Sequence, residues 1–380
     1  INQNTPTRTG DAADPQYGAR LGQTIGQAVV AKMNNGEWAA VFGNGYRSPG
    51  DTAASIPGDQ GSLYIVRISD GTLIRRIDTG FGSLGAPNGL GTPTLYDANG
   101  DEIADYAYAP DMRGNVWKFS LTGSTASSWN LAFAADSSAG FPNGRPLFTA
   151  VNGSSQFQPI SARVELASAP PGKAGIMVLF GTGRFFAVGD NTDATGQSFY
   201  GIWDNGTPVT ATNRSTLQVQ TISTVNIDLR GVTTGVREVT TNTVDWTTKR
   251  GWYIDLPTSM ERVIGTAAVR DNRVIFTTLI PSNDPCVFGG SGWLMEVGAT
   301  TGAQLPYAVF DTNGDKLVTS ADRILAGVPV GVGMVKRPLV IDGSPVAAKF
   351  LSGTTSEIQI ERNRTFGPPL GRESWREVQQ

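Results

Sequence analysis

Histidine is absent from this chain of 380 residues, and cysteine occurs once. Without histidine, the chain has no Ser-His-Asp triad, no Cys-His pair and no histidine-based zinc site. The single cysteine, Cys286, has no partner for an internal disulfide and no histidine to activate its thiolate. We expect Cys286 to be a small buried residue or to pair with a cysteine outside this chain.

Charged residues and long apolar runs are also scarce. Charged residues make up 17% of the chain, the net charge is −3 and the pI is near 5.2, so no nucleic acid partner is expected. The longest apolar runs, such as residues 175–180, are too short to cross a bilayer, so no transmembrane segment is expected. The chain begins at Ile1 without a signal-like segment, and we expect it to be a piece of a longer exported protein.

Glycine, by contrast, is abundant, and the chain contains repeats. The 47 glycines stand among short apolar runs, which is typical of the many tight turns of an all-β protein. A glycine, an alternating strand and a polar turn ending in glycine recur at residues 61–71, 114–123 and 292–302. An apolar strand that runs into a Gly-x-Gly turn recurs at residues 38–46 and 177–185. Such units predict one β-propeller domain over residues 1–380, with about seven or eight blades at roughly 40–50 residues per blade.

Other segments are less regular. Three stretches rich in Thr, Ser, Asn and Gly are interpreted as long loops or irregular blades: 50–60, 123–147 and 187–250. Four tryptophans in or near alternating strands are predicted to belong to the blade core: Trp117, Trp203, Trp252 and Trp293. Asp111 is predicted to form hydrogen bonds within a turn rather than to act as a catalytic acid.

Two segments share the pattern D-x-N-G-D-x-[IL], at residues 97–103 and 311–317. Side-chain oxygens at positions 1, 3 and 5 of a tight loop, with the carbonyl of position 7, are the ligands that Ca²⁺ requires. The predicted ligands of the first loop are Asp97, Asn99, Asp101, the carbonyl of Ile103, and Asp105. Those of the second and weaker candidate are Asp311, Asn313, Asp315, the carbonyl of Leu317, Thr319 and Asp322. The sequence therefore predicts Ca²⁺ as its cofactor.

Both loops depart from the usual calcium loop at position 6, where Glu102 and Lys316 replace glycine. We expect backbone strain or a different loop path at these two residues. The first loop has Tyr108 at position 12, so Asp105 must complete its ligand shell. In the second loop, the shorter side chain of Asp322 stands at position 12, and Lys316 weakens the attraction for a cation. The alternative is that both segments are polar hairpin turns without metal.

The chain resembles the C-terminal propeller domain of the PilY and PilC group of type IV pilus biogenesis and tip-adhesin proteins. The resemblance extends from about residue 14 to residue 377 and is most specific over 14–121 and 281–377. The segments that carry it are GNGY (43–46), GSLYI (61–65), NGLGTP (88–93), YAYAPDMRGNVWKF (106–119), FGTGRF (180–185), the region of Cys286 and GRESWRE (371–377).

This resemblance implies an all-β, modified seven-bladed β-propeller with long irregular loops and a surface calcium loop that matches Asp97, Asn99, Asp101, Ile103 and Asp105. It also implies a non-enzymatic module, at the cell surface, outer membrane or pilus tip, that regulates pilus extension versus retraction. Twitching motility and surface attachment belong to the same expectation. The implied partners are minor pilins or other pilus components, and host or abiotic surfaces. A quinoprotein-like dehydrogenase and a carbohydrate-binding or carbohydrate-processing propeller are the alternatives.

Overall fold

Side chains alternate between the two faces of each strand, and their burial shows which strands are covered on one face and which on both. In β2 (Trp38–Gly43) every second residue is buried, so one face of the strand packs against a neighbour. In β12 (Ile176–Gly181) and β13 (Ser198–Asp204) every residue is buried, so both faces of these strands are covered. The computed structural model describes residues 21–22, 24, 26–46, 60–83, 86–210, 214–282, 284, 289–343 and 346–365.

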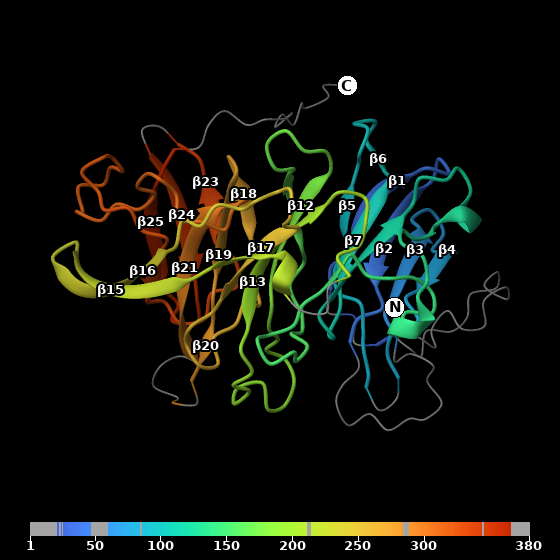
Figure 1. Ribbon diagram of the computed structural model, residues 1–380, viewed down its shortest axis with the longest axis horizontal. Coiled ribbons are helices and arrows are strands. Elements are labelled where there is room, and N and C mark those ends of the chain that lie inside the picture. Colours follow the sequence, from blue (N-terminus) through green and yellow to red (C-terminus); the bar gives the residue numbers. More distant parts are fainter. Residues whose placement is uncertain are drawn as a thin grey trace.

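The described strands form five sheets, which follow one another along the long axis of the molecule (Figure 1). The first sheet has the order β4 (Leu73–Asp78), β3 (Ser62–Arg67), β2, β1 (Val29–Met33), β6 (Ile103–Ala104). The second has the order β10 (Phe148–Thr149), β8 (Asn115–Ser120), β7 (Tyr106–Pro110), β5 (Thr94–Tyr96), with β9 (Asn130–Leu131) beside β8. The third has the order β11 (Glu165–Ser168), β12, β13, β17 (Gly251–Asp255), β14 (Gln218–Gln220).

The fourth sheet contains seven strands and the fifth contains three. The order of the fourth is β15 (Ile222–Leu229), β16 (Val232–Val239), β22 (Gly327–Val330), β21 (Gly290–Gly298), β19 (Arg273–Thr277), β18 (Ala268–Arg270), with β20 (Ile280–Pro281) beside β21. The order of the fifth is β23 (Leu339–Ile341), β24 (Val346–Ser352), β25 (Ile358–Arg364). The described helices are short 3-10 turns, η2 (Ala126–Ser128), η3 (Ser137–Ala139) and η4 (Arg214–Thr216). Within the described ranges, none is long and apolar enough to cross a membrane.

Successive sheets pack face to face, and the alternation along each strand provides both contacts. In β12, Val178 and Phe180 share one core cluster with residues of the second sheet. Met177 and Leu179, on the opposite face of the same strand, share another cluster with residues of the fourth sheet. The third sheet is thus covered by its neighbours on both faces, which is the arrangement of a propeller blade.

The predicted core tryptophans lie in these interfaces. Trp117, Trp203 and Trp252 are buried, and Trp293 is half-buried against the cluster that contains Trp203 and Trp252, so the prediction is confirmed. Asp111 is fully buried and accepts the backbone N–H groups of Arg113 and Asn115, both at 2.9 Å. Its role within a turn is therefore also confirmed.

Segment 187–250, predicted to form long loops or irregular blades, contains the regular hairpin of β15 and β16. All eight residues of β15 pair with β16. Half of the side chains of β15 are polar and exposed, and apolar and polar residues alternate only over 225–229, a short run within a segment rich in Thr, Ser, Asn and Gly. Cys286 lies outside the described residues.

Candidate metal centre

The first loop connects β5 to β6 and lies where the first and second sheets meet. Because β6 pairs in parallel with β1, Lys32 opposite Ile103, the end of the loop is attached to the first sheet. Residues 98–102 are exposed, whereas Asp105 is buried. The loop is therefore open to solvent on one side and anchored in the blade on the other.

Asp97 organises the backbone of this loop. Its Oδ1 accepts the N–H of Gly100 and its Oδ2 accepts the N–H of Glu102, both at 2.7 Å. Burial acts to raise the pKa of Asp97, but the backbone N–H groups of Glu102 and Gly100 outweigh that effect and the pKa is lowered. The carboxylate at position 1 is therefore kept ionised, as a cation ligand must be.

The side chains at positions 3 and 5 are held in the same way. Asn99 Oδ1 accepts the N–H of Asp101, and Asp101 Oδ1 accepts the N–H of Ile103, both at 2.9 Å. Asn99 Nδ2 donates to Asp101 Oδ2 at 3.1 Å. Asp105 Oδ2 accepts the N–H of Ala98 at 3.0 Å. The side chains of all four predicted ligands are therefore bonded within one short loop.

The second loop connects β21 to β22 and repeats this geometry. Asp311 Oδ1 accepts the N–H of Gly314 at 2.7 Å, and its Oδ2 accepts the N–H of Lys316 at 3.0 Å. Asn313 Oδ1 accepts the N–H of Asp315 at 2.9 Å, and Asn313 Nδ2 donates to Asp315 Oδ2 at 3.1 Å. The N–H of Leu317 completes the pattern with a bond of 2.8 Å to Asp315 Oδ1. The side chains at positions 1, 3 and 5 therefore make the same hydrogen bonds in both loops.

The two loops differ in the residue that closes them. In the second loop Asp322 Oδ1 accepts the N–H of Thr312 at 2.7 Å, the bond that Asp105 makes with position 2 of the first loop. Asp322 Oδ2 accepts the N–H of Thr319 at 2.8 Å. The hydroxyl of Thr319 accepts the N–H of Ala321 at 3.1 Å. Asp322, rather than Thr319, is thus the counterpart of Asp105.

The strain expected at position 6 is present in both loops. Glu102 has φ 67° and Lys316 has φ 69°, in the left-handed region that costs a residue with a Cβ about 1 kcal/mol. Gly100 and Gly314, with φ 82° and 83°, adopt the same region without that cost. The loops therefore follow the same backbone path despite their different residues.

The donors of both loops are oxygens, which suits a hard cation such as Ca²⁺. In the part of the chain that the structure describes, no three acidic, histidine or cysteine side chains lie close enough together to bind an ion without other ligands. Amide and carbonyl oxygens would complete each set, as in other calcium loops. The first loop has three aspartates and Glu102 at its rim, whereas the second has three aspartates and the exposed Lys316.

Tertiary contacts reach each loop from residues that sequence patterns do not indicate. Asn34, in the turn after β1, donates from Nδ2 to the carbonyl of Ala104 at 3.1 Å and to Asp105 Oδ1 at 3.4 Å. Arg230, at the tip of the β15–β16 hairpin, donates from Nε to the carbonyl of Asp311 at 2.9 Å. Neither residue belongs to a motif, so no sequence signal could have identified it.

The face-to-face sheets and the loop geometry define an all-β propeller with a candidate cation site. A family model described as the PilY1 beta-propeller domain matches residues 7–229. The chain belongs to this family, and the propeller fold predicted from the sequence is confirmed.

Curated relatives and a solved structure agree with this assignment. A type IV pilus biogenesis factor PilY1 homolog of Xylella fastidiosa is 32% identical and covers 94% of this chain and 26% of its own length. The type IV pilus biogenesis factor PilY1 of Pseudomonas aeruginosa is 33% identical over 79% of this chain and 27% of its own length. The crystal structure of the Pseudomonas aeruginosa PilY1 C-terminal domain matches with a TM-score of 0.74 and 27% identity, covering 92% of this chain and 73% of that one. The chain thus spans about a quarter of the length of the curated relatives it matches.

Proposed function

We propose that this chain is a calcium-responsive module of a type IV pilus biogenesis protein. One observation carries the calcium part of the proposal. Two loops far apart in the sequence share five internal hydrogen bonds, all within positions 1 to 7. The shared D-x-N-G-D sequence produces this arrangement twice, and each time it places carboxylate and amide oxygens at the spacing of a calcium loop.

The first loop is the principal site. Its proposed ligands are the side chains of Asp97, Asn99, Asp101 and Asp105 with the carbonyl of Ile103. The second loop is the weaker site, because Lys316 adds a positive charge beside it. Its proposed ligands are Asp311, Asn313, Asp315, Leu317 through its carbonyl, Thr319 and Asp322.

Ion binding would act on these loops as a charge switch. Without a cation, three carboxylates in one short loop repel each other, whereas a divalent ion neutralises most of that charge. The end of the first loop pairs with β1, and Asn34 contacts Asp105. Ordering of the loop by Ca²⁺ would therefore extend to the turn between β1 and β2.

The family of the chain supports the pilus context. Relatives that match most of this chain are named type IV pilus biogenesis factors. We place this chain by analogy on the cell surface or pilus tip, with minor pilins or other pilus components as partners and with host or abiotic surfaces as attachment sites. Calcium occupancy would bias pili toward extension or retraction, and thereby twitching motility and attachment.

A calorimetric titration of the metal-stripped chain with CaCl₂ tests the calcium sites. We expect two sets of sites, with Asp101→Ala removing the tighter and Asp315→Ala the weaker. Asp70→Ala is the matched control, because Asp70 Oδ1 also accepts the N–H two residues ahead, at 2.9 Å, outside a D-x-N-G-D loop. Binding that both loop variants retain would overturn the ligand assignment.

The pilus context needs a test in cells. In bacteria that express the full-length protein, Asp101→Ala should change the number of surface pili and the twitching zone at millimolar Ca²⁺, and Asp70→Ala should not. Equal pilus counts and equal twitching for both variants would refute the regulatory role while leaving the calcium sites intact.

A further inference from the structure

The turn of the β15–β16 hairpin carries an arginine in a conformation that arginine disfavours. Arg230 and Gly231 are the only residues between the two strands, and their φ angles are 57° and 85°. Two positive φ angles in a two-residue loop are typical of a type I′ turn, in which Asn-Gly is preferred at these positions. A left-handed arginine costs about 1 kcal/mol, so contacts elsewhere must hold it.

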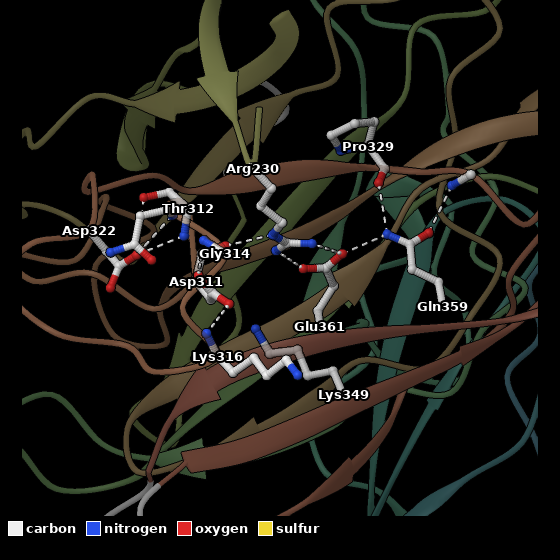
Figure 2. A network of polar contacts seen from close by, with 12 residues as sticks. Arg230, Asp311, Thr312, Gly314, Lys316, Asp322, Pro329, Lys349, Gln359 and Glu361 are labelled. Carbon is white, nitrogen blue, oxygen red and sulfur yellow. Dashed lines mark hydrogen bonds and ion pairs between the residues drawn. The ribbon is translucent and has the colours of Figure 1, made fainter. Parts of the chain in front are cut away.

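Those contacts connect the hairpin to the second loop (Figure 2). The backbone N–H of Arg230 donates to the carbonyl of Thr312 at 3.0 Å, and its Nε donates to the carbonyl of Asp311 at 2.9 Å. A Cβ placed on Gly314 would lie 3.5 Å from the Cβ and Cγ of Arg230, so the stem of the arginine lies against the loop. Positions 1, 2 and 4 of the loop are thereby in contact with one residue.

The guanidinium group continues from the loop to the fifth sheet. Arg230 forms a two-pronged ion pair with Glu361 of β25, with Nη2–Oε2 at 2.5 Å and Nη1–Oε1 at 3.3 Å. Glu361 is 3% exposed, and Gln359 donates to its Oε1 at 2.8 Å. Gln359 in turn donates to the carbonyl of Pro329 in β22, the strand that follows the loop, at 3.2 Å. The arginine is held in one position by buried neighbours on both sides (Figure 2).

The hairpin whose tip makes these contacts lies at the surface of the molecule. Figure 1 shows β15 and β16 (yellow) as a long curved hairpin that reaches one end of the molecule. β15 is the terminal strand of the fourth sheet in the described residues, and half of its side chains are exposed. A change at the second loop that reaches Arg230 therefore reaches a surface strand that is open to a partner.

We propose that Arg230 is a positioning residue that couples ion binding in the second loop to the order of the β15–β16 hairpin tip. This inference rests on the second calcium site proposed above. An ion that draws Asp311 and Asp315 together fixes the positions of the Asp311 and Thr312 carbonyls, which accept hydrogen bonds from Arg230. In the other direction, an Arg230 side chain held in place keeps these carbonyls in the geometry that suits the ion. Because such coupling is reciprocal, each event strengthens the other by the same factor.

The test is hydrogen exchange of residues 224–237 with and without CaCl₂, with binding measured by calorimetry. An Asp101→Asn background confines binding to the second loop. We expect Ca²⁺ to slow exchange at the tip about 5-fold, near the lower limit of ordinary coupling factors. Adding Arg230→Asn, which suits the turn but removes the guanidinium, should abolish this slowing and weaken binding by a similar factor, because Glu361 already neutralises the guanidinium and its removal takes hydrogen bonds from the loop. Arg270→Asn, which removes an exposed arginine of β18 in the same sheet, is the control for charge.

Glu361→Gln provides a second variant, because it leaves Arg230 and the turn in place but breaks the ion pair. Binding at the second loop without any slowing at the tip would overturn the coupling and leave the site. The same conclusion would follow if Arg230→Asn and Glu361→Gln both responded to Ca²⁺ like their parent. An absence of saturable binding in the Asp101→Asn background would overturn the second site and the coupling together.

Discussion

Replacing one aspartate in each loop by asparagine should remove calcium binding and leave the loop folded. In Asp101→Asn, the remaining side-chain oxygen still accepts the N–H of Ile103, a bond of 2.9 Å in the parent. Asp315→Asn preserves the corresponding bond to Leu317, at 2.8 Å. Both positions are exposed, so the lost contact with the neighbouring asparagine costs at most about 1 kcal/mol. The metal-free variants should therefore be nearly as stable as the parent.

The calcium-bound forms should differ by an amount that follows from linkage. At a free Ca²⁺ concentration 100 times the Kd, one site stabilises the folded chain by about 2.7 kcal/mol. The entropy of unfolding is about 2.1 cal/mol/K per residue, and for 380 residues this converts the stabilisation to a rise in Tm of about 3 °C per site. The parent should gain an increment from each loop, with the smaller one from the weaker second loop, each single variant should keep one, and the double variant none.

Differential scanning calorimetry of all four proteins, in EDTA and in CaCl₂, measures these increments. Equal concentrations of MgCl₂ provide the control, because Mg²⁺ requires a stricter octahedral geometry and should produce smaller shifts. Calcium-dependent shifts of equal size in the parent and the double variant would refute the assignment of positions 97–105 and 311–322 as the sites.

Three other outcomes are expected. Asn34→Ala should weaken calcium binding at the first loop about 10-fold and leave the second unchanged by calorimetry, because the residue orients a ligand without being one. A hydrogen bond from Ser138 and, second, one from Arg145 lower the pKa of Asp136 to about 2. The ionised carboxylate therefore stabilises the folded chain fully above its unfolded pKa near 4. This stabilisation is lost as the pH falls through 2. Chemical denaturation should therefore show a lower free energy of unfolding for Asp136→Asn than for the parent at pH 7, and the difference should disappear between pH 4 and 2. Gly201→Ala should cost about 1–3 kcal/mol in urea unfolding, since its Cβ would lie 2.4 Å from the ring of Trp252; an unchanged midpoint would contradict this packing.

Much of the candidate site was predictable because its hydrogen bonds are local. In each loop the carboxylates and amides at positions 1, 3 and 5 bind N–H groups two to five residues ahead. Such bonds depend on residue type and spacing alone, so a D-x-N-G-D pattern implies the geometry wherever it occurs. The strain at Glu102 and Lys316 was predictable for the same reason, because the missing glycine is visible in the sequence.

The propeller was predictable from repetition, whereas its polar hairpin was not. Short apolar runs that end in glycine-rich turns mark buried strands, and β2 and β12 are such runs. The strand β15 has no such run: apolar residues alternate with polar ones over 225–229, and the strand also depends on backbone pairing with β16 and on the contacts of its tip. A sequence rich in Thr and Asn fits a loop as well as such a strand.

By itself, the sequence determined the all-β class, the family and the two oxygen-rich loops, because composition, repeats and local spacing are sufficient for each. Only the tertiary structure decided what contacts the loops. Asn34 reaches Asp105 across 71 residues, and Arg230 joins residues 81 and 131 positions away. These pairs depend on which sheet faces which and where a hairpin ends, and the packing of the whole chain sets both.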